Sequence, residues 1–473
     1  MEKEIYQKYM QKLLNLSEKI SKYLIAAVLI IVPLLPKFPL IKVTGTYVAI
    51  RFEDVLMLLL AVILIPKFLV DFKKIWKDRI LASILIFFAI TFISLLAGAF
   101  ITQTIELRLG LLHWARRIEY MVPFLAAYLL IPKDKIRESA EFFFKVLLIV
   151  IALLFGYGMG EKYFNFPVII TQNQDYSKGI ALFWTPGSHI NSTFAGHYDL
   201  SAFVVLVMPI LLAALFSVKG IFTKIILALS SGMGLWLLIN SISRTAQATY
   251  LFAVTITLIL LRKYKAWVAV AIISLISMFM SSGLDARFTQ AIKYLYQRIS
   301  GAGGVSYVSS GFTVRAADET VTLEANPMPT PMSTPVPQTG VNDVSIAIRT
   351  NVEWPRAIRA FLKNPMLGTG YSSIDLATDN DYLRMLGETG ILGALAFALI
   401  ILSMGKVYLK VFKLKDKLDD FEKSYLFGIL GGAAGIFATA ILIDLFEASK
   451  LAIVFWLLLG SSVNLIKSKV NEQ

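Results

Sequence analysis

The residue types best suited to catalysis gather between Arg349 and Gly393, directly before a hydrophobic run. This segment is RTNVEWPRAIRAFLKNPMLGTGYSSIDLATDNDYLRMLGETGILG. The planar guanidinium of Arg349 is suited to holding phosphate oxygens with two hydrogen bonds. Asp379 and Glu388 are carboxylates that can accept a proton from a reacting hydroxyl. The segment therefore predicts a site that binds an anion and performs acid–base chemistry.

Three features of this segment also have plain structural interpretations. Gly368-Thr369-Gly370 can bring backbone N–H groups to a phosphate, but the same residues suit an ordinary turn. Asp379 precedes an apolar run, where an N-cap would stabilise the following helix by about 1 kcal/mol. Pro355 predicts that a helix over 344–362 is kinked or restarted. Arg356 lies seven residues after Arg349, so both are expected on one helix face.

Other charged residues lie at the edges of hydrophobic runs, where burying a charge is costly and a functional role is the first hypothesis. Arg244 lies in NSISRTAQATY, between two such runs. Arg116 and Arg117 lie in the outer half of another, and a salt bridge from Arg116 to Glu119 is the structural alternative. At two further sites snorkelling or a solvated cap explains the charges; these are Arg51, Glu53 and Asp54, and Asp444, Glu447 and Lys450.

The composition determines what must position these residues. Hydrophobic residues make up 57% of the 473 residues, charged residues only 16%, and the mean hydropathy is +0.68. These values are typical of an all-α polytopic membrane protein. Cysteine is absent and there are three histidines, which argues against disulfides, thiolate catalysis and a metal centre. We expect no cofactor.

A spanning helix needs about 20 apolar residues, which predicts about twelve spans in one membrane domain over 1–473. The expected spans are 23–41, 53–70, 80–99, 113–131, 140–157, 197–216, 225–240, 244–261, 266–283, 385–404, 425–443 and 449–466. Lysines and arginines follow the even-numbered spans, which predicts that both termini are cytoplasmic. The net charge of +14 reflects this topology and attraction to anionic lipids, so no nucleic-acid partner is expected.

This orientation predicts two long outer loops, 158–196 and 284–384, the second between helices 9 and 10. The first mixes aromatic residues with Asn, Gln, Asp and His, a composition suited to sugars, although an ordered loop packed on helix ends fits equally well. It leads to His197. The second bears the candidate site and contains a Pro/Thr/Ser-rich stretch within 302–343, which we interpret as a flexible insertion without a catalytic role.

An arginine pocket on the outer side of a membrane suits a polyprenyl-diphosphate-linked glycan. Its diphosphate lies at the level of the lipid headgroups, and its sugar projects outward. Guanidinium groups can carry the charge of the departing diphosphate, so no metal is required.

Several motifs together resemble the O-antigen ligase/O-antigen polymerase superfamily. They are Arg349-x4-Trp354, NPMLGTG, Asp379-Asn380-x-Tyr382-Leu383 and Glu388-x-Gly390-x-x-Gly393, preceded in the chain by NSTFAGHYDLSAF and SRTAQATY. The resemblance implies a bacterial cytoplasmic-membrane enzyme with a fold related to C-type glycosyltransferases. It further implies that an undecaprenyl-diphosphate-linked saccharide is transferred to a glycan or lipid-linked acceptor, and that Arg244 and Arg349 bind the diphosphate. A chain-length regulator or a flippase are candidate partners.

The chain departs from this family at one position. Many family ligases have His-Asn where this chain has Asp379-Asn380, and that histidine is a proposed catalytic residue. A carboxylate can still act as the general base in inverting sugar chemistry. The difference favours a polymerase, whose acceptor is a second lipid-linked saccharide, over a lipopolysaccharide ligase.

We therefore expect direct displacement at the anomeric carbon, with Asp379 as the base and Arg244 and Arg349 on the departing diphosphate. The expected substrate contacts are Arg116, Arg117, His197, Arg356, Tyr382 and Glu388. A transporter or flippase is the alternative, since about twelve helices suit it too, but it should show paired charges near mid-membrane and related halves. An assembly subunit with a degenerate site is the third hypothesis.

Overall fold

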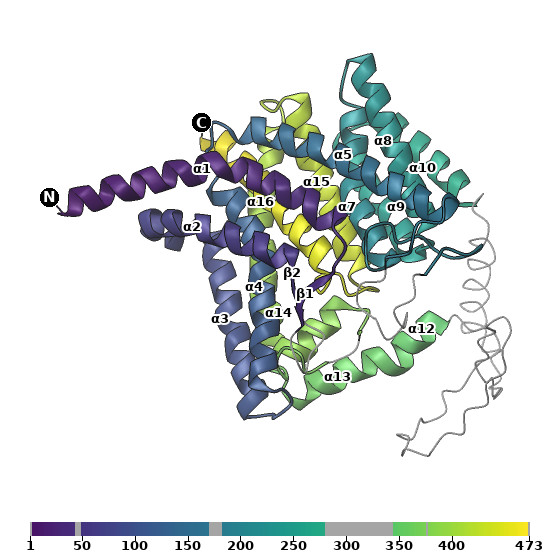
Figure 1. Cartoon of the computed structure of the whole chain (residues 1–473). Coiled ribbons are helices and arrows are strands. Elements are labelled where there is room, and N and C mark those ends of the chain that lie inside the picture. Colours follow the sequence, from purple (N-terminus) through teal and green to yellow (C-terminus); the bar gives the residue numbers. More distant parts are fainter. Residues whose placement is uncertain (1, 43–48, 170–181, 280–343, 375–376, 472–473) are drawn as a thin grey trace, which may run out of the picture.

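The computed structural model of the chain describes residues 2–42, 49–169, 182–279, 344–374 and 377–471, and helices dominate them (Figure 1). The elements are α1 (Glu2–Leu34), β1 (Pro39–Lys42), β2 (Ala49–Arg51), α2 (Phe52–Lys77), α3 (Arg79–Phe100), α4 (Leu107–Leu129), α5 (Ile136–Tyr163), α7 (His197–Leu215), α8 (Ile221–Asn240), α9 (Arg244–Leu260), α10 (Tyr264–Phe279), α12 (Val344–Ile348), the π-helical turn η1 (Arg349–Glu353), α13 (Trp354–Lys363), α14 (Asp381–Leu414), α15 (Asp420–Thr439) and α16 (Ser449–Asn471). Each predicted span overlaps one helix, and the only sheet in these residues is the antiparallel β1–β2 hairpin. The predicted insertion at 302–343 and much of the second outer loop lie outside the described residues.

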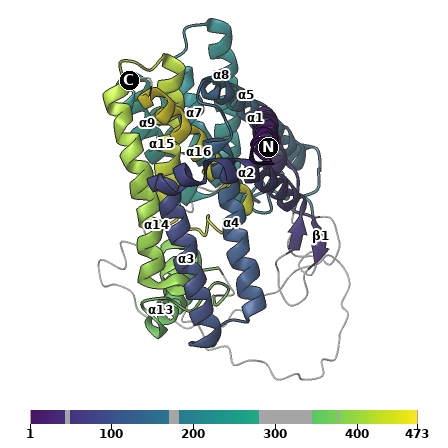
Figure 2. The ribbon, with the colours of Figure 1, turned by 90° about the vertical axis from the view of Figure 1, so that its left-hand side faces the viewer.

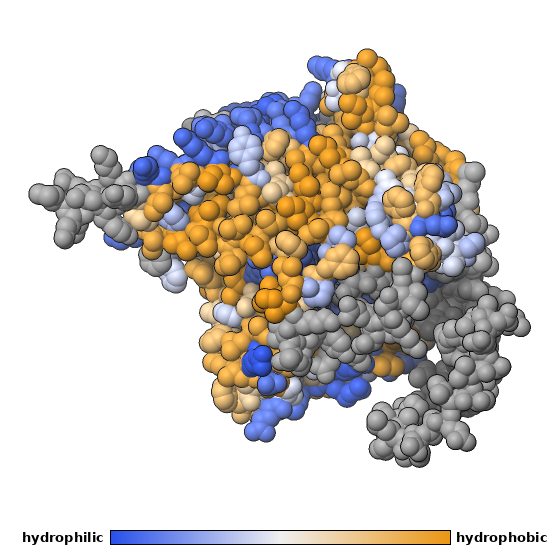
Figure 3. All heavy atoms as spheres, in the orientation of Figure 1, coloured by the Kyte–Doolittle hydropathy of each residue, from blue (hydrophilic) through white to orange (hydrophobic). Residues whose placement is uncertain are grey.

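Six of the described helices are long and apolar enough to cross a membrane: α3, α5, α7, α8, α14 and α16. The apolar helices α9 and α10 are shorter. Hydrophobic residues dominate the middle of the face in Figure 3, and hydrophilic residues gather toward its upper left and lower edges. The chain is therefore a multi-pass, mostly helical membrane protein. The number of about twelve spans stays a prediction, as does the position of the large loop.

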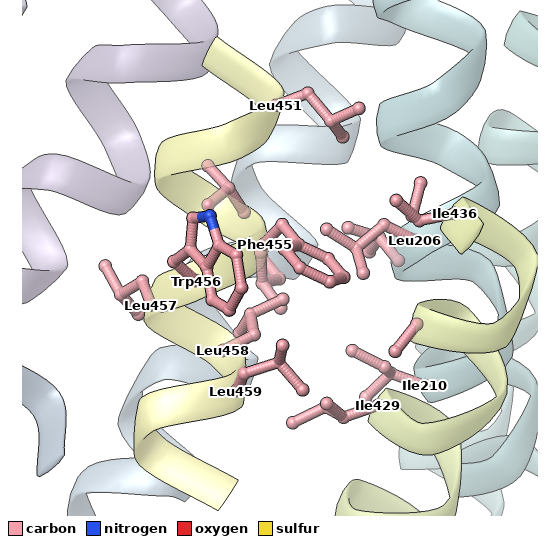
Figure 4. Packing of buried hydrophobic residues seen from close by; sticks show 14 of the residues in the cluster. Leu206, Ile210, Ile429, Ile436, Leu451, Phe455, Trp456, Leu457, Leu458 and Leu459 are labelled. Atoms are coloured by element: carbon pink, nitrogen blue, oxygen red, sulfur yellow. The ribbon is translucent and has the colours of Figure 1, made fainter. Parts of the chain in front are cut away.

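The core of the protein lies along α16, which is buried over most of its length. Figure 4 shows Phe455 of α16 facing aliphatic side chains of α7 and α15, among them Leu206 and Ile436. Small residues bring α15 very close to α7, because a Cβ atom on Gly432 would lie 2.4 Å from the carbonyl oxygen of Leu206. Helices in membranes commonly associate through such small residues. This packing provides a rigid support for the loop between α15 and α16.

A second group of helices, α3, α4 and α14, extends to the lower end of the molecule, where α13 lies against α14 (Figures 1 and 2). The helix predicted over 344–362 is interrupted, as expected, but by the π-helical turn Arg349–Glu353 upstream of Pro355. Pro355 instead occupies the first turn of α13, where its missing N–H costs nothing. Because a π turn is wider than an α turn, this interruption sets the direction in which Arg349 points.

Candidate active site

Arg349 and Asp379 form a direct ion pair that joins η1 to the loop before α14. The Nε and Nη2 atoms of Arg349 donate to Oδ2 of Asp379 at 3.0 and 2.6 Å. The arginine side chain is 8% exposed and the aspartate side chain 24%. Both hydrogen bonds end on Oδ2, so Oδ1 is the oxygen that can meet an incoming hydroxyl. The structure thus brings together two of the three residues predicted to be catalytic.

The environment of Asp379 makes it a stronger base than an ordinary aspartate. Burial raises its pKa, the charge and hydrogen bonds of Arg349 oppose this effect, and the negative charge of Asp444 adds to it. The pKa of Glu353 in η1 is also raised, mainly by burial and then by the charge of Asp379. A base is most effective when its pKa approaches the working pH. The raised pKa of Asp379 therefore suits proton transfer.

Arg384 lies at the centre of a second cluster next to this pair. Its Nη1 atom lies 3.0 Å from Oδ2 of Asp444, and its Nε atom lies 3.2 Å from Glu447 and 3.6 Å from Glu388. Glu447 also pairs with Arg117, whose guanidinium lies 5.5 Å from the ring centroid of Tyr371. The cluster combines residues from α4, α14 and the α15–α16 loop. A network of this size leaves few buried charges unpaired, as a water-poor site requires.

This cluster forms the polar wall of a pocket with about 570 Å³ of space not filled by protein atoms, its open mouth included. The ionisable residues of its lining are Arg117, Asp381, Arg384, Glu388 and Glu447. Much of the remaining lining is apolar and aromatic; it includes Phe87, Phe397, Phe446 and Trp456. A pocket lined by both charged and aromatic side chains can bind a ligand with both polar and apolar parts.

The Gly368-Thr369-Gly370 turn is structural, as its alternative interpretation supposed. The N–H groups of Gly368, Thr369 and Gly370 donate to the carbonyl oxygens of Asn364, Gly387 and Glu388. In return, the N–H groups of Ile391 and Leu392 donate to Pro365 and Met366. These bonds satisfy the backbone where α14 breaks at Gly390 (φ 65°, ψ −171°). The turn thus supports α14 at its break, and none of these three N–H groups is left for a phosphate.

We expect Gly390→Ala to destabilise the protein. Its Cβ atom would lie 2.4 Å from the carbonyl oxygen of Met366, and the backbone conformation itself costs other residues about 1–3 kcal/mol. Gly405→Ala in the same helix is the matched control, because a Cβ atom there has no neighbour within 4 Å. Thermal unfolding in detergent should show a lower Tm for the first variant and an unchanged or higher Tm for the second. Equal Tm values would contradict the role of Gly390.

The other predicted contacts are spread over the described helices. Arg116 donates to Ala49 and pairs with Asp54 at 3.0 Å. The hydroxyl of Tyr382 donates to Phe437 at 2.7 Å. His197 begins α7 and its ring lies 3.8 Å from that of His189, Arg244 begins α9, and one terminal nitrogen of Arg356 is buried without a hydrogen-bond partner among the described residues. Roles in substrate binding stay predictions for all five.

Several alternatives considered from the sequence are wrong. Asn380, not Asp379, caps α14, and its side chain accepts from Leu383 at 2.9 Å. Arg116 pairs with Asp54 instead of forming the salt bridge to Glu119. Side chains expected at the surface are buried; they are Arg51, Glu53 and Lys450. Lys450 donates to the carbonyl oxygens of Pro33 and Thr193, so it joins α1 to the segment before α7.

Sequence reasoning missed Arg384 and underestimated Asp444 and Glu447. A signal was present, because all three charges lie at the ends of hydrophobic runs, where pairing is expected. Their partners could not be identified, since 60 residues separate Arg384 from Asp444 and more than 300 separate Arg117 from Glu447.

Comparisons with known proteins agree with the motifs. The family model described as O-antigen ligase matches residues 225–398, which include Arg244, Arg349, Asp379 and Glu388. A search among curated proteins returns no match. The family match supports the resemblance drawn from the motifs: residues 225–398 are similar to the O-antigen ligase family, within the O-antigen ligase/O-antigen polymerase superfamily.

Proposed function

We propose that this protein transfers an undecaprenyl-diphosphate-linked glycan to an acceptor hydroxyl on the outer face of the bacterial cytoplasmic membrane. The observation that carries the proposal is the Arg349–Asp379 pair inside the segment that matches the O-antigen ligase family. It places a cation suited to a diphosphate beside a carboxylate suited to an acceptor hydroxyl. Both termini would then be cytoplasmic and the pair would lie at the outer boundary of the membrane.

In this proposal Asp379 removes the proton of the acceptor hydroxyl, whose oxygen attacks the anomeric carbon. The bond from that carbon to the diphosphate oxygen breaks, and the configuration is inverted. Arg349 and Arg244 stabilise the negative charge that develops on the leaving diphosphate. The pocket beside Arg384 offers the apolar and polar surfaces for the lipid-linked substrate, and no metal is needed.

The donor would also activate the base. In the free protein, Arg349 gives both of its described hydrogen bonds to Asp379. A diphosphate that engages the same guanidinium would weaken these bonds and bring negative charge close to the carboxylate. Both effects raise the pKa of Asp379. The base would therefore become stronger when the donor is bound, which limits proton abstraction to the loaded enzyme.

The acceptor is a second lipid-linked saccharide in the version that we favour, because Asp379 occupies the position where many family ligases have histidine. Purified protein in liposomes should convert a lipid-linked repeat unit into a ladder of longer chains, and an excess of EDTA should leave the ladder unchanged. A single transfer to a lipid core would indicate a ligase. Absence of any product, with translocation of the lipid across the bilayer, would support the transporter, and absence of both would support an assembly subunit.

A further inference from the structure

Two loops hold each other at the start of α14 through their own carboxylates. One loop, 378–381, contains Asp379 and leads into α14. The other, 440–446, connects α15 to α16. Asp444 from the second loop accepts hydrogen bonds from the backbone N–H groups of Thr378 at 2.7 Å and Asn380 at 3.0 Å. The two N–H groups that it binds are those on either side of Asp379.

The second loop is bound in the same way by an aspartate of the first. Oδ2 of Asp381 accepts hydrogen bonds from the backbone N–H groups of Leu445 at 2.7 Å and Phe446 at 3.2 Å. The N–H group of Asp381 donates to the carbonyl oxygen of Ala440 at 3.0 Å. Each loop thus supplies an aspartate to the backbone of the other. We call this arrangement the aspartate clasp.

The clasp acts on the backbone of Asp379 itself. Asp379 has a φ of 49°, in the left-handed region that residues other than glycine seldom adopt. Such a conformation persists only where the surroundings determine it. Hydrogen bonds from N–H groups to a charged acceptor are among the strong ones. The bonds from Thr378 and Asn380 to Asp444 therefore stabilise this unusual turn.

Arg384 in turn orients Asp444. Its Nη1 atom donates to Oδ2 of Asp444 at 3.0 Å, and its Nη2 atom donates to the carbonyl oxygen of Ile374 at 2.9 Å. The side chains of Arg384 and Asp444 are 12% and 11% exposed. A buried guanidinium with bonds at both ends of its fork has little freedom to move. The clasp is thereby anchored to the wall of the pocket.

We propose that Asp444, held by Arg384, is a positioning residue that sets the direction of the Asp379 carboxylate toward Arg349 and the acceptor. The proposal rests on the role of Asp379 as the base under the proposed function. Asp444 need not touch the substrate. It acts through the backbone on both sides of Asp379, and this distinguishes it from the other carboxylates of the cluster.

Asp444→Asn tests the proposal in the liposome assay. An asparagine side chain has one acceptor oxygen, so one of the two N–H groups loses its partner. A small displacement of a reacting group lowers rates strongly, so we expect kcat at the pH optimum to fall about 100-fold. The KM for the lipid-linked repeat unit should change little. The charged groups facing Asp379 are Arg349, Glu353 and Asp444. Loss of the negative charge of Asp444 should lower the pKa of Asp379. The acidic limb of the plot of kcat against pH should therefore move to lower pH.

Arg384→Lys separates geometry from charge. Lysine keeps the positive charge but cannot donate to Asp444 and Ile374 together as the fork does. We expect kcat to fall about 10-fold, because the clasp loosens, while the acidic limb stays in place, because both charges remain. Asp419→Asn is the matched control. Asp419 likewise accepts from a backbone N–H group and pairs with an arginine, Arg137, but at the opposite end of α15.

The outcomes distinguish this proposal from the proposed function. If Asp444→Asn and Asp419→Asn have the same kcat and pH profile, Asp444 is merely structural and the positioning role is overturned. Normal kcat in Arg384→Lys also overturns the part assigned to Arg384. If Asp379→Asn lowers kcat strongly while Asp444→Asn leaves kcat unchanged, only the inference fails. If Asp379→Asn is itself fully active, the proposed base is wrong and the inference fails with it.

Discussion

Arg349→Ala is expected to abolish long polysaccharide in the host while the amount of membrane-inserted protein stays unchanged. Loss of one group that stabilises a developing negative charge lowers kcat by roughly 100- to 1,000-fold, and more where the group is a forked cation in a buried site. The protein should still fold, because Asp379 can take up a proton once its partner is gone. Gel analysis of the glycan and immunoblotting of the protein measure the two quantities.

Arg359→Ala provides the control for the arginine prediction. Arg359 lies on α13, ten residues further along the chain, and its side chain is exposed. The Arg359→Ala variant should therefore produce polysaccharide of normal chain length. Arg349→Lys keeps a charge without the fork, so an intermediate yield is expected. Normal chain lengths in Arg349→Ala would exclude the assignment of this arginine to the leaving group.

Asp379→Asn is expected to lower kcat by about 100- to 10,000-fold, the usual contribution of a general base. Asparagine preserves the size of the side chain and tolerates the positive φ at this position. The native enzyme should lose activity as the pH falls through the pKa of Asp379, since the protonated carboxyl cannot accept a proton. Burial raises this pKa, so the acidic limb should lie above the range of an ordinary aspartate. Measurement of kcat against pH locates it.

Asp379→His makes the prediction sharper. Many family ligases have histidine at this position, so the variant should retain part of its activity. Its acidic limb should move toward the unperturbed histidine pKa of about 6.5, and the adjacent Arg349 should hold it below that value. If the acidic limb of the pH profile is the same in the native enzyme and in Asp379→His, another residue accepts the proton. Glu388 is then the next candidate, because it lines the same pocket.

The hydrophobic pattern predicted the helices well, because runs of apolar residues are a local signal that needs no knowledge of partners. The motifs also indicated Arg349 and Asp379 as candidate site residues, and the structure places them in contact. Their direct pairing was not predictable, since they are 30 positions apart and a π-helical turn, a helix and a glycine turn occupy this stretch. An aspartate before an apolar run, such as Asp379, suits a helix cap, but in the structure the neighbouring Asn380 performs that function.

The charges of the α15–α16 loop were harder to interpret. Asp444 and Glu447 follow a hydrophobic run, where solvated residues are common. In the structure Arg384 from α14 pairs with Asp444, and Arg117 from α4 pairs with Glu447. Nothing in the local sequence of either helix indicates these ion pairs. Pairings between segments so far apart are determined by how the helices pack, and helix packing was the part of the structure that the sequence pattern left open.

The aspartate clasp also bears on the modularity of the protein. The segment that matches the O-antigen ligase family ends at residue 398. Asp444 and Glu447 follow it in the chain, and Arg117 precedes it by more than 100 residues. The matched segment is therefore not a transplantable catalytic unit. An exchange of residues 225–398 between two such enzymes would have to carry the α15–α16 loop and α4 along with it, because the boundary of sequence similarity cuts through a single bonded network.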